Sequence, residues 1–533
     1  MALLVELLFF TLLVFVPLRA ITNLIIKHKY GHHLPPGPIA LPIIGHFHLL
    51  GPLKHRSLYK LSLRYGPLFS LRLGSVRAVV ANTGDVAKQF LKTNEFSFIH
   101  RPATIGITLV TNNVALTFAP YGPYWKFVKK LTMTELLGTR SVNKFISLRA
   151  RQCRRFFRFL AQKSELRESV NLSEELSKLT NTIMVQMVLG TQSASIEGRV
   201  EEARILTRDV TNIFGEFNLA DHFWICKKLD LQGFEKRIDN ILARIDKFLE
   251  VIIVEREEQR RLRNINGGGR GGRNGVVTEE DEDVKDFLDF LLDVSEDENA
   301  EIKLTRTHVK SFVMEYFTAG TDSTATAADW TIGEILNHPK VLEKAREEID
   351  RVVGKNRLVG ESDGPNLPYI QAIIKETLRL HPPFPVVNRK CVEACKIDKY
   401  MIPENTMLFL NLWAINRDPN FWENPSEFRP ERFLEPNERD KMGPIDIKGQ
   451  HFQALPFGSG RRICPGKNLV LQMLPGLVAG MIQCFDWKVV NGKMDGNDSV
   501  MEMDERQGMT LSSARDLVCV PVARFSPLTI LDP

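Results

Sequence analysis

"PFGSGRRICPG", residues 456–466, places a single cysteine, Cys464, among three glycines, two prolines and two arginines. A thiolate that binds a metal needs stabilisation of its charge and a backbone that bends away from the sulfur. Gly458, Gly460 and Gly466 permit such turns. The apolar run that follows predicts a helix, and the amino terminus of a helix favours a thiolate over a thiol. The segment therefore predicts a metal site built on one sulfur.

A single protein ligand suits a metal whose other positions are occupied by a macrocycle, and haem iron with an axial thiolate is that case. Arg462 would then pair with a porphyrin propionate. The seven cysteines of the chain are odd in number, scattered and without a repeated CxxC spacing. This pattern argues against a zinc site or a disulfide framework and indicates reduced thiols that face the cytosol.

The composition is that of an ordinary globular protein, with 44% hydrophobic and 25% charged residues in a chain of 533. Lys and Arg number 70 and Asp and Glu 64, and the net charge of +6 is too small for this length to indicate nucleic-acid binding. The stretch 264–283 is Gly-rich and then acidic, and its GGRGGR core is similar to RNA-binding segments. Because it is one short copy, we interpret it as a flexible loop between two helices and predict no nucleic-acid partner.

The N-terminal residues 2–18 are apolar except for Glu6 and Thr11, and basic residues follow between 19 and 29. A cleaved signal peptide is the alternative, but it would carry its positive charge before the apolar run. We therefore predict a retained, single-pass membrane anchor over residues 1–26, with the rest of the chain in the cytosol. The basic and proline-rich stretch 27–45 predicts a stiff hinge, and 46–533 the catalytic domain.

The catalytic domain has mainly helical periodicity with a small strand region, in which "LFSLRL" and "RAVVAN" flank a "GSV" turn. The longest predicted helix runs from Leu304 to His338 and is stopped by Pro339. At about 1.5 Å per residue it is long enough to cross the whole protein. We therefore expect this helix to organise the domain.

The middle of that helix reads "AGTDSTATA", residues 319–327. Serine and threonine often bond back to the carbonyl one turn earlier, so a local bend without chemistry is one interpretation. Asp322 favours another, because a carboxylate flanked by Ser323 and Thr324 in the centre of a spanning helix is typical of a proton-delivery group.

A second polar group is predicted from "KETLR", where Glu376 and Arg379 lie three residues apart and hence on one helical face. Alone, such a pair is commonly an exposed ion pair that contributes less than about 1 kcal/mol. Arg432 in the Pro-marked segment "FRPERF" supplies another guanidinium. One carboxylate shared by two guanidiniums would form a rigid, charge-assisted cluster.

The cysteine segment resembles the haem-binding signature of cytochromes P450, Phe-x-x-Gly-x-Arg-x-Cys-x-Gly. Phe457, Gly460, Arg462, Cys464 and Gly466 fill its five fixed positions. Further family motifs follow the expected order along essentially the whole chain, namely the Pro-rich hinge, "WKFVK", "AGTDST", the Glu-x-x-Arg pair and "PERF". The resemblance implies the mainly helical P450 fold with a small β region, preceded by one transmembrane anchor helix.

The resemblance also implies the cofactor and the redox partner. The cofactor would be haem b with Cys464 as the axial ligand of the iron, and electrons would come from NADPH through NADPH-cytochrome P450 reductase at the endoplasmic reticulum membrane. The predicted cofactor-binding residues are Cys464, Arg462, Trp125, Lys129, Arg389, Phe457 and Gly460. The predicted catalytic residues are Asp322, Ser323 and Thr324, and the predicted structural triad is Glu376, Arg379 and Arg432.

Two positions depart from the usual family pattern. Lys129 stands where the family usually has arginine, so a bidentate grip on a propionate becomes a single point charge. Ser323 stands where threonine is usual, and it lacks the methyl group that fixes the rotamer. We expect Ser323 to keep the proton-relay role. A haem-binding sensor would need only the cysteine loop, and the intact acid and alcohol argue against it.

The wider sequence, including "FAPYGPYWKFVKKL" and "GQHFQALPFGSGRR", resembles plant P450s that oxidise flavonoid skeletons, nearest to flavone synthase II and flavanone 2-hydroxylase. The resemblance implies a small phenolic substrate, a flavanone such as naringenin, oxidised at C2 and C3. Two alternatives are 2-hydroxyisoflavanone synthase, which characteristically has Leu and Lys at the positions of Phe384 and Asn388, and a hydroxylase of another metabolite such as a triterpene. The predicted substrate pocket contains Phe118, Phe312, Ala319, Phe384, Asn388 and Met509.

Overall fold

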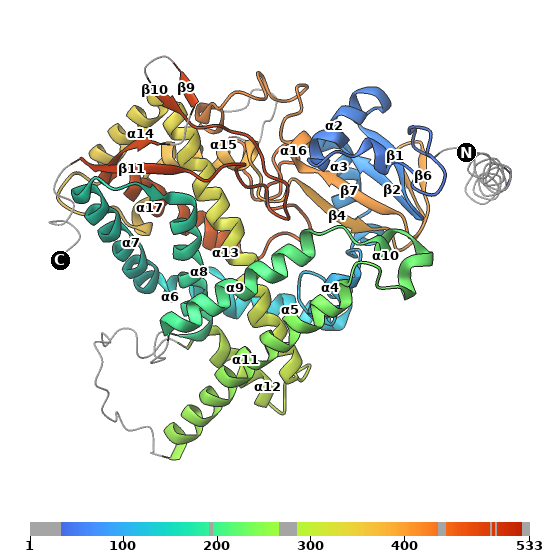
Figure 1. The fold of residues 1–533 in the computed structure, drawn as a ribbon, viewed down its shortest axis with the longest axis horizontal. Coiled ribbons are helices and arrows are strands. Elements are labelled where there is room, and N and C mark those ends of the chain that lie inside the picture. The colour runs from blue at the N-terminus through green and yellow to red at the C-terminus, as the bar shows by residue number, and fades with distance from the viewer. Residues whose placement is uncertain are drawn as a thin grey trace, which may run out of the picture.

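The computed structural model describes Pro17 and residues 34–190, 196–265, 285–434, 444–490, 493–495 and 498–524. The chain is mainly helical with a small β region, as predicted (Figure 1). The helices are α2 (Lys54–Tyr65), α3 (Gly84–Lys88), α4 (Ile105–Thr111), α5 (Pro123–Leu131), α6 (Thr139–Lys144), α7 (Ile146–Leu166), α8 (Leu172–Leu189), α9 (Ile196–Gly215), α10 (Leu219–His222), α11 (Phe234–Ile265), α12 (Phe287–Glu296), α13 (Arg306–Asn337), α14 (Pro339–Val352), α15 (Pro368–Leu380), α16 (Leu412–Ile415) and α17 (Lys467–Cys484).

The strands form four small sheets in the described part of the chain. They are β1 (Leu68–Leu73), β2 (Val76–Ala81), β3 (Val170–Asn171), β4 (Val386–Lys390), β5 (Cys395–Ile397), β6 (Tyr400–Ile402), β7 (Met407–Asn411), β8 (Phe485–Val489), β9 (Lys493–Asp495), β10 (Asp498–Val500) and β11 (Val518–Ala523). The largest sheet has the order β1-β2-β7-β4, in which β2 and β7 are parallel and the other pairs antiparallel. The predicted "GSV" turn joins β1 to β2, with Gly74 at φ +60°.

The long helix α13 passes through the middle of the molecule and matches the predicted helix to within two residues at its N-terminus and one at its C-terminus (Figure 1). Thr305 caps it by accepting a hydrogen bond from the backbone N–H of His308. It ends one residue before His338, because Pro339 starts α14.

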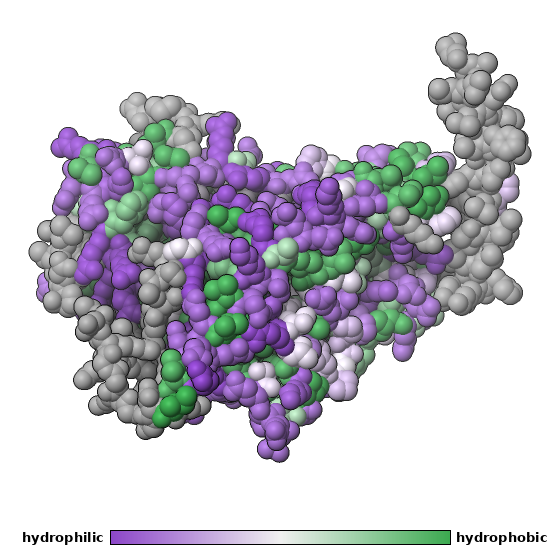
Figure 2. All heavy atoms as spheres, turned by 60° about the horizontal axis from the view of Figure 1, so that its bottom comes forward, coloured by the Kyte–Doolittle hydropathy of each residue, from purple (hydrophilic) through white to green (hydrophobic). Residues whose placement is uncertain are grey.

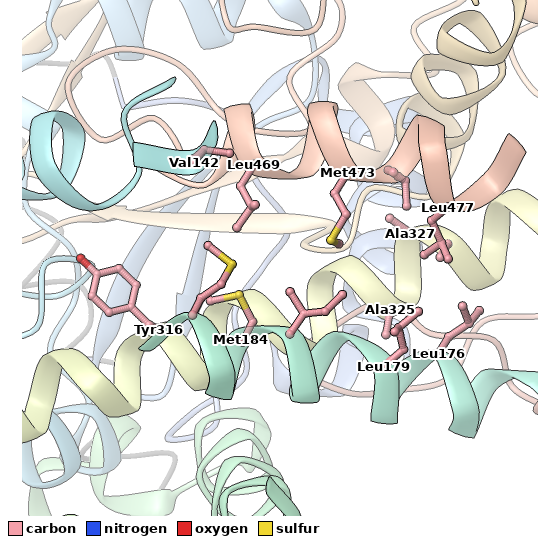
Figure 3. Packing of buried hydrophobic residues seen from close by; sticks show 14 of the residues in the cluster. Val142, Leu176, Leu179, Met184, Tyr316, Ala325, Ala327, Leu469, Met473 and Leu477 are labelled. Atoms are coloured by element: carbon pink, nitrogen blue, oxygen red, sulfur yellow. The ribbon is translucent and has the colours of Figure 1, made fainter. Parts of the chain in front are cut away.

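The main hydrophobic core lies where α13 packs against α8, α15 and α17. Figure 3 shows Leu176, Leu179 and Met184 of α8 facing α13, and Leu469, Met473 and Leu477 of α17 facing the same space. Gly320 permits this close approach, because a Cβ atom there would lie 2.7 Å from the sulfur of Met184. The glycine in the predicted polar patch therefore serves helix packing.

The proline-rich segment docks along the first sheet. Ser70 of β1 donates its backbone N–H to the carbonyl of Pro36 at 2.7 Å and its hydroxyl to that of Pro35 at 2.8 Å. The N–H of His46 bonds to the carbonyl of Arg72. The described part of the predicted hinge is therefore fastened to the catalytic domain.

Apart from Pro17, the predicted membrane anchor, residues 1–26, lies outside the described ranges, as do residues 27–33 of the hinge and most of the predicted loop 264–283. The two flanking helices of that loop are present, since α11 ends at Ile265 and α12 begins at Phe287. Among the described residues, no helix combines the length and apolar character that crossing a bilayer requires.

Candidate functional site

The cysteine loop is bent as the sequence predicted at two of its three glycines. Gly458 and Gly460 both have φ of +72°, a region that favours glycine. An added Cβ at Gly460 would also collide with the carboxylate of Glu95. The prediction was wrong for Gly466, whose φ is −79°, because it caps α17 in a conformation open to other residues. The backbone N–H of Cys464 bonds to the carbonyl of Phe457 at 3.0 Å and closes the loop.

The sulfur of Cys464 lies at the start of α17, as predicted. Burial raises the pKa of this thiol above its usual value. Four groups oppose that shift, namely the backbone N–H groups of Gly466 and Lys467 and the side chains of Lys129 and Arg101. The groups that would stabilise a thiolate bound to a metal ion are therefore in place around the sulfur.

Three buried guanidiniums, those of Arg101, Arg389 and Arg462, converge beside the cysteine loop. Burial lowers the pKa of all three, that of Arg389 well below the usual range and those of Arg101 and Arg462 to about 10 and about 9. The positive charge of Arg101 lowers the pKa of each of the other two still further. Two carboxylates offset this, since Glu315 faces Arg101 and Arg462, and Glu95 faces Arg389.

Such a cluster needs an anion, because unpaired buried charges are costly. Arg101 Nε is buried without a hydrogen-bond partner among the described residues, and Arg389 donates only a long 3.3 Å bond to the carbonyl of its neighbour Asn388. Two carboxylates held beside a metal-binding thiol would accept hydrogen bonds from the unpaired donors of both Arg101 and Arg389. The residues present therefore fit haem b, whose propionates carry this charge. Arg101 was missed at the sequence level, since no spacing distinguishes it from other arginines.

Arg462, Trp125 and Lys129, predicted to hold the cofactor, also fasten the cysteine loop to the body of the protein. The indole N–H of Trp125 donates to the carbonyl of Leu116 at 3.0 Å, and the guanidinium of Arg462 lies 4.7 Å from the centre of the indole ring. Lys129 Nζ donates to the carbonyl of Ile463 at 3.1 Å, and burial lowers the pKa of this lysine to about 8. Their donors are thus largely committed to backbone carbonyls.

The predicted proton-delivery residues of α13 point in different directions. Burial raises the pKa of the Asp322 carboxyl, and its interactions with the Thr211 side chain of α9 and with Arg208 oppose this shift. Ser323 Oγ donates to the carbonyl of Ala319, one turn earlier, at 2.7 Å. Thr324 is buried. Because adjacent helical residues are about 100° apart around the axis, the acid and the alcohol serve neighbouring faces of α13.

The face of α13 that carries Ser323 is not fully covered by neighbouring elements. Ala319 is exposed although it lies in the middle of a central helix between the buried Phe317 and Thr321. One turn earlier, Glu315 accepts hydrogen bonds from the N–H groups of Leu116 and Thr117 at 2.7 and 2.6 Å. Glu315 thus joins α13 to the loop before α5. Sequence reasoning missed this carboxylate, because nothing in its neighbours sets it apart.

The structure brings Glu376, Arg379 and Arg432 together. Both oxygens of Glu376 accept hydrogen bonds from Arg379, at 2.6 and 2.8 Å, and Oε1 also accepts one from Arg432 Nε at 2.9 Å. The side chains of Glu376 and Arg379 are fully buried. The remaining donors of the arginines bind backbone carbonyls of Asn416, Glu423 and Pro425. The cluster thus joins α15 to the segment before the cysteine loop.

The predicted pocket residues are spread over several elements. Phe118 packs edge-to-face on Phe214 of α9 at 5.7 Å, whereas Phe312 is buried in the main core. Phe384 and Asn388 are half-buried, and Oδ1 of Asn388 has no hydrogen-bond partner in the described part of the chain. Met509 lines a cavity of about 1300 Å³ between α9, α11, α13 and residues 506–516, and Asp322 borders the same cavity.

Comparisons with known proteins agree on the family. A family model described as Cytochrome P450 matches residues 35–519. The chain is 50% identical to Cytochrome P450 93B16 of Glycine max over 97% of each chain, and 49% identical to 2-hydroxyisoflavanone synthase of Glycyrrhiza echinata over 94% of each. It is 46% identical to 3,9-dihydroxypterocarpan 6A-monooxygenase of Glycine max over 93% of this chain and 94% of that one. A solved zebra fish cytochrome P450 with progesterone has the same fold, with a TM-score of 0.70, 24% identity and coverage of 89% of this chain and all of the other.

Proposed function

The chain belongs to the cytochrome P450 family, and we propose that it converts flavanones such as naringenin to flavones by oxidation at C2 and C3. Its class is established, since family and fold make it a cytochrome P450 monooxygenase that carries haem b and receives electrons from NADPH through a reductase. The predicted resemblance to plant P450s that oxidise flavonoid skeletons is likewise confirmed by its relatives. The substrate and the reaction at C2 and C3 are our proposal.

The relationship to 2-hydroxyisoflavanone synthase supports a flavonoid-type substrate, because nearly half of all positions are identical over almost the full length of both chains. Phe384 and Asn388 stand where that branch characteristically has leucine and lysine, which favours oxidation without aryl migration. The unpartnered Oδ1 of Asn388 supports a phenolic substrate, since it could accept a hydrogen bond from a hydroxyl group. A second candidate, formation of a 2-hydroxyisoflavanone, is supported by the same identity.

The residues of this chain would divide the work as follows. Haem b, when bound, supplies the activation of O2. Cys464 would ligate its iron, and Arg101 and Arg389 would hold its propionates. Burial raises the pKa of Asp322, which favours the protonated carboxyl that a proton donor needs. Ser323 would relay a proton only after turning its hydroxyl away from the carbonyl of Ala319.

We also propose that the chain is held at the endoplasmic reticulum membrane by residues 1–26, with the catalytic domain, residues 46–533, facing the cytosol and its reductase. Large apolar side chains support this location. Those of Ile39, Ile43, Trp224, Ile225 and Leu231 are 63–83% exposed, although such groups are usually covered. The segment that contains Ile39 and Ile43 lies close to the segment that contains Trp224, Ile225 and Leu231, because Phe47 packs against Phe217 and His222. Figure 2 shows apolar patches of this kind on a mostly hydrophilic face.

Incubation of microsomes that contain the protein and a reductase with naringenin and NADPH tests the proposed reaction. A flavone product would support it, and 2-hydroxyflavanone would indicate hydroxylation without desaturation. An isoflavone after dehydration would favour the second candidate. Absence of any product, in protein that shows the thiolate spectrum, would exclude flavanones and leave another metabolite such as a triterpene.

A further inference from the structure

Two cysteines far from the sulfur of the cysteine loop form a pair of their own. Cys391 directly follows β4, and Cys395 begins β5. Cys391 is completely buried in a core cluster at the sheet end of the molecule, and Cys395 packs against the same cluster while remaining half-buried. The three residues between them, 392–394, are exposed. One residue of the pair is thus partly accessible to solvent and the other is not.

The two thiols contact each other and their immediate surroundings. A side-chain hydrogen bond links Cys391 and Cys395. Cys391 Sγ also lies 3.0 Å from the carbonyl oxygen of Glu393, and Cys395 makes a side-chain hydrogen bond with Ser97. Sulfurs within hydrogen-bonding reach of each other, on a short turn, can join without a large rearrangement of the chain.

The two sulfurs differ in reactivity. The hydrogen bond from Cys391 lowers the pKa of Cys395, against the effect of burial, and the bond from Ser97 adds to the lowering. The same hydrogen bond and burial raise the pKa of Cys391. Cys395 is therefore the less buried cysteine with more thiolate character, and Cys391 is the neighbouring thiol that can resolve an oxidised product.

We propose that Cys391 and Cys395 form a redox-active pair that hydrogen peroxide converts to a disulfide. The thiolate of Cys395 attacks one oxygen of the peroxide, the O–O bond breaks, and hydroxide leaves, which gives a sulfenic acid. The thiol of Cys391 then attacks that sulfur and releases water as the S–S bond forms. Overall, two thiols are oxidised, and one peroxide and two hydrogen atoms become two waters. A dithiol reductant reverses the step.

The pair has a source of oxidant and a connection to the site. O2 that takes up two electrons and two protons without oxidising a substrate becomes hydrogen peroxide, so a monooxygenase can produce this oxidant itself.

The turn that carries Cys391 and Cys395 is hydrogen-bonded to the segment that supports the cysteine loop. Lys390 and Val392 donate their N–H groups to the carbonyls of His100 and Ser97, both at 2.8 Å. Arg462 Nε donates to the carbonyl of Ile99, between them. Oxidation would replace the contact between the Cys395 thiol and Ser97 of that segment by the disulfide bond to Cys391.

The other cysteines provide internal controls. Burial raises the pKa values of Cys153, Cys484 and Cys519 to about 12, which makes them poor nucleophiles. Cys226 is half-buried in the short 3-10 helix Trp224–Lys228 and is therefore comparable to Cys395 in exposure. A thiol oxidised merely because solvent reaches it should be found at Cys226 as well.

Peptide mass spectrometry of the full-length holoenzyme tests the pair directly. Lys390 and Lys396 are trypsin sites, so both cysteines fall in one peptide, CVEACK. The protein is treated with hydrogen peroxide, denatured in iodoacetamide and digested. We expect this peptide unalkylated and two hydrogen atoms lighter than its dithiol form, with Cys226 alkylated. Dithiothreitol added before iodoacetamide should restore two alkylated cysteines.

The variant Cys391→Ser separates the pair mechanism from simple exposure. In this variant the disulfide cannot form, and we expect a sulfenic acid at Cys395 that dimedone traps. Full alkylation of both cysteines in the wild type after peroxide would overturn the proposal. Oxidation of Cys226 to the same extent as Cys395, or a disulfide from Cys395 to any other cysteine, would overturn it too.

Discussion

Arg462 Nη2 donates a 2.6 Å hydrogen bond to the backbone carbonyl of Ala119, which lies 343 positions earlier in the chain. The same guanidinium also bonds to the carbonyls of Ile99, Leu116 and Thr117. This single side chain thus fastens the loop of Cys464 to the segment that leads into α5. The position of the sulfur relative to the buried cations depends on this fastening.

Replacing Arg462 by lysine should destabilise the protein, because an ammonium cannot bond to carbonyls spread along both edges of a guanidinium. We expect a loss of about 2 kcal/mol in the free energy of unfolding, measured by urea denaturation. The matched control is Arg461→Lys. Arg461 is half-exposed and lies 3.7 Å from Glu95, so its replacement should cost less than about 0.5 kcal/mol. Equal losses in the two variants would contradict the fastening role.

Replacing Cys464 by alanine should abolish the long-wavelength Soret band of the reduced carbon monoxide complex, because that band requires a thiolate on the iron. Cys484→Ala is the control, since Cys484 is a buried cysteine at the far end of α17. It should keep the band. A band that survives in Cys464→Ala would mean that another residue ligates the iron.

Glu376→Gln should cost about 3–5 kcal/mol in the free energy of unfolding, because it leaves two buried guanidiniums without their shared carboxylate. Glu201→Gln is matched in geometry. Glu201 also pairs with an arginine three residues away through two hydrogen bonds, but its side chain is 53% exposed. Its replacement should cost less than about 1 kcal/mol. If the two costs were similar, burial would not be what makes the triad stabilising.

Asp322→Asn keeps the size of the side chain but removes an acid that can donate a proton. We expect turnover of an oxidised substrate to fall about 100-fold while the carbon monoxide spectrum is unchanged. Since burial raises the pKa of Asp322, the wild type should lose rate as pH rises through that raised value. Asp209→Asn is the control, because Asp209 borders the cavity between α9, α11 and α13 that Asp322 also borders, but it pairs with Arg244. Equal turnover in wild type and Asp322→Asn would remove the carboxyl from the proton path.

Glu505 should stabilise the protein in a pH-dependent way. Burial raises its pKa, but hydrogen bonds from His55 and Arg56 outweigh this and hold the value at about 2. A folded-state pKa below the unfolded one contributes stability above the unfolded pKa, and that stability is lost as pH falls toward the folded value. Glu505→Gln should therefore lower the free energy of unfolding by about 3 kcal/mol at pH 7. The difference from wild type should narrow as pH falls from about 5 to about 2, and a constant difference would contradict the ionic interaction.

Much of the site could be predicted from short sequence patterns before the fold was known. A glycine-bent cysteine before a helix, the Glu-x-x-Arg spacing of Glu376 and Arg379, and the polar patch around Asp322 are short-range patterns, and each lies where the pattern predicts it. Arg101 and Glu315 were not predictable in this way. Their roles come from burial and from partners more than a hundred residues away, which no local pattern records.

The amino-acid sequence alone was enough to identify the family and the helical architecture and to single out Cys464, because each rests on short motifs of residues that are close together in the chain. The tertiary structure determined which charged side chains come into contact and which buried charges have no partner of opposite charge. Arg101, Arg389 and Arg462 become a binding site for an anionic group only when three distant segments bury them together and remove the water that would screen their repulsion. The pairing of Cys391 with Cys395 likewise depends on the turn that brings their sulfurs into contact.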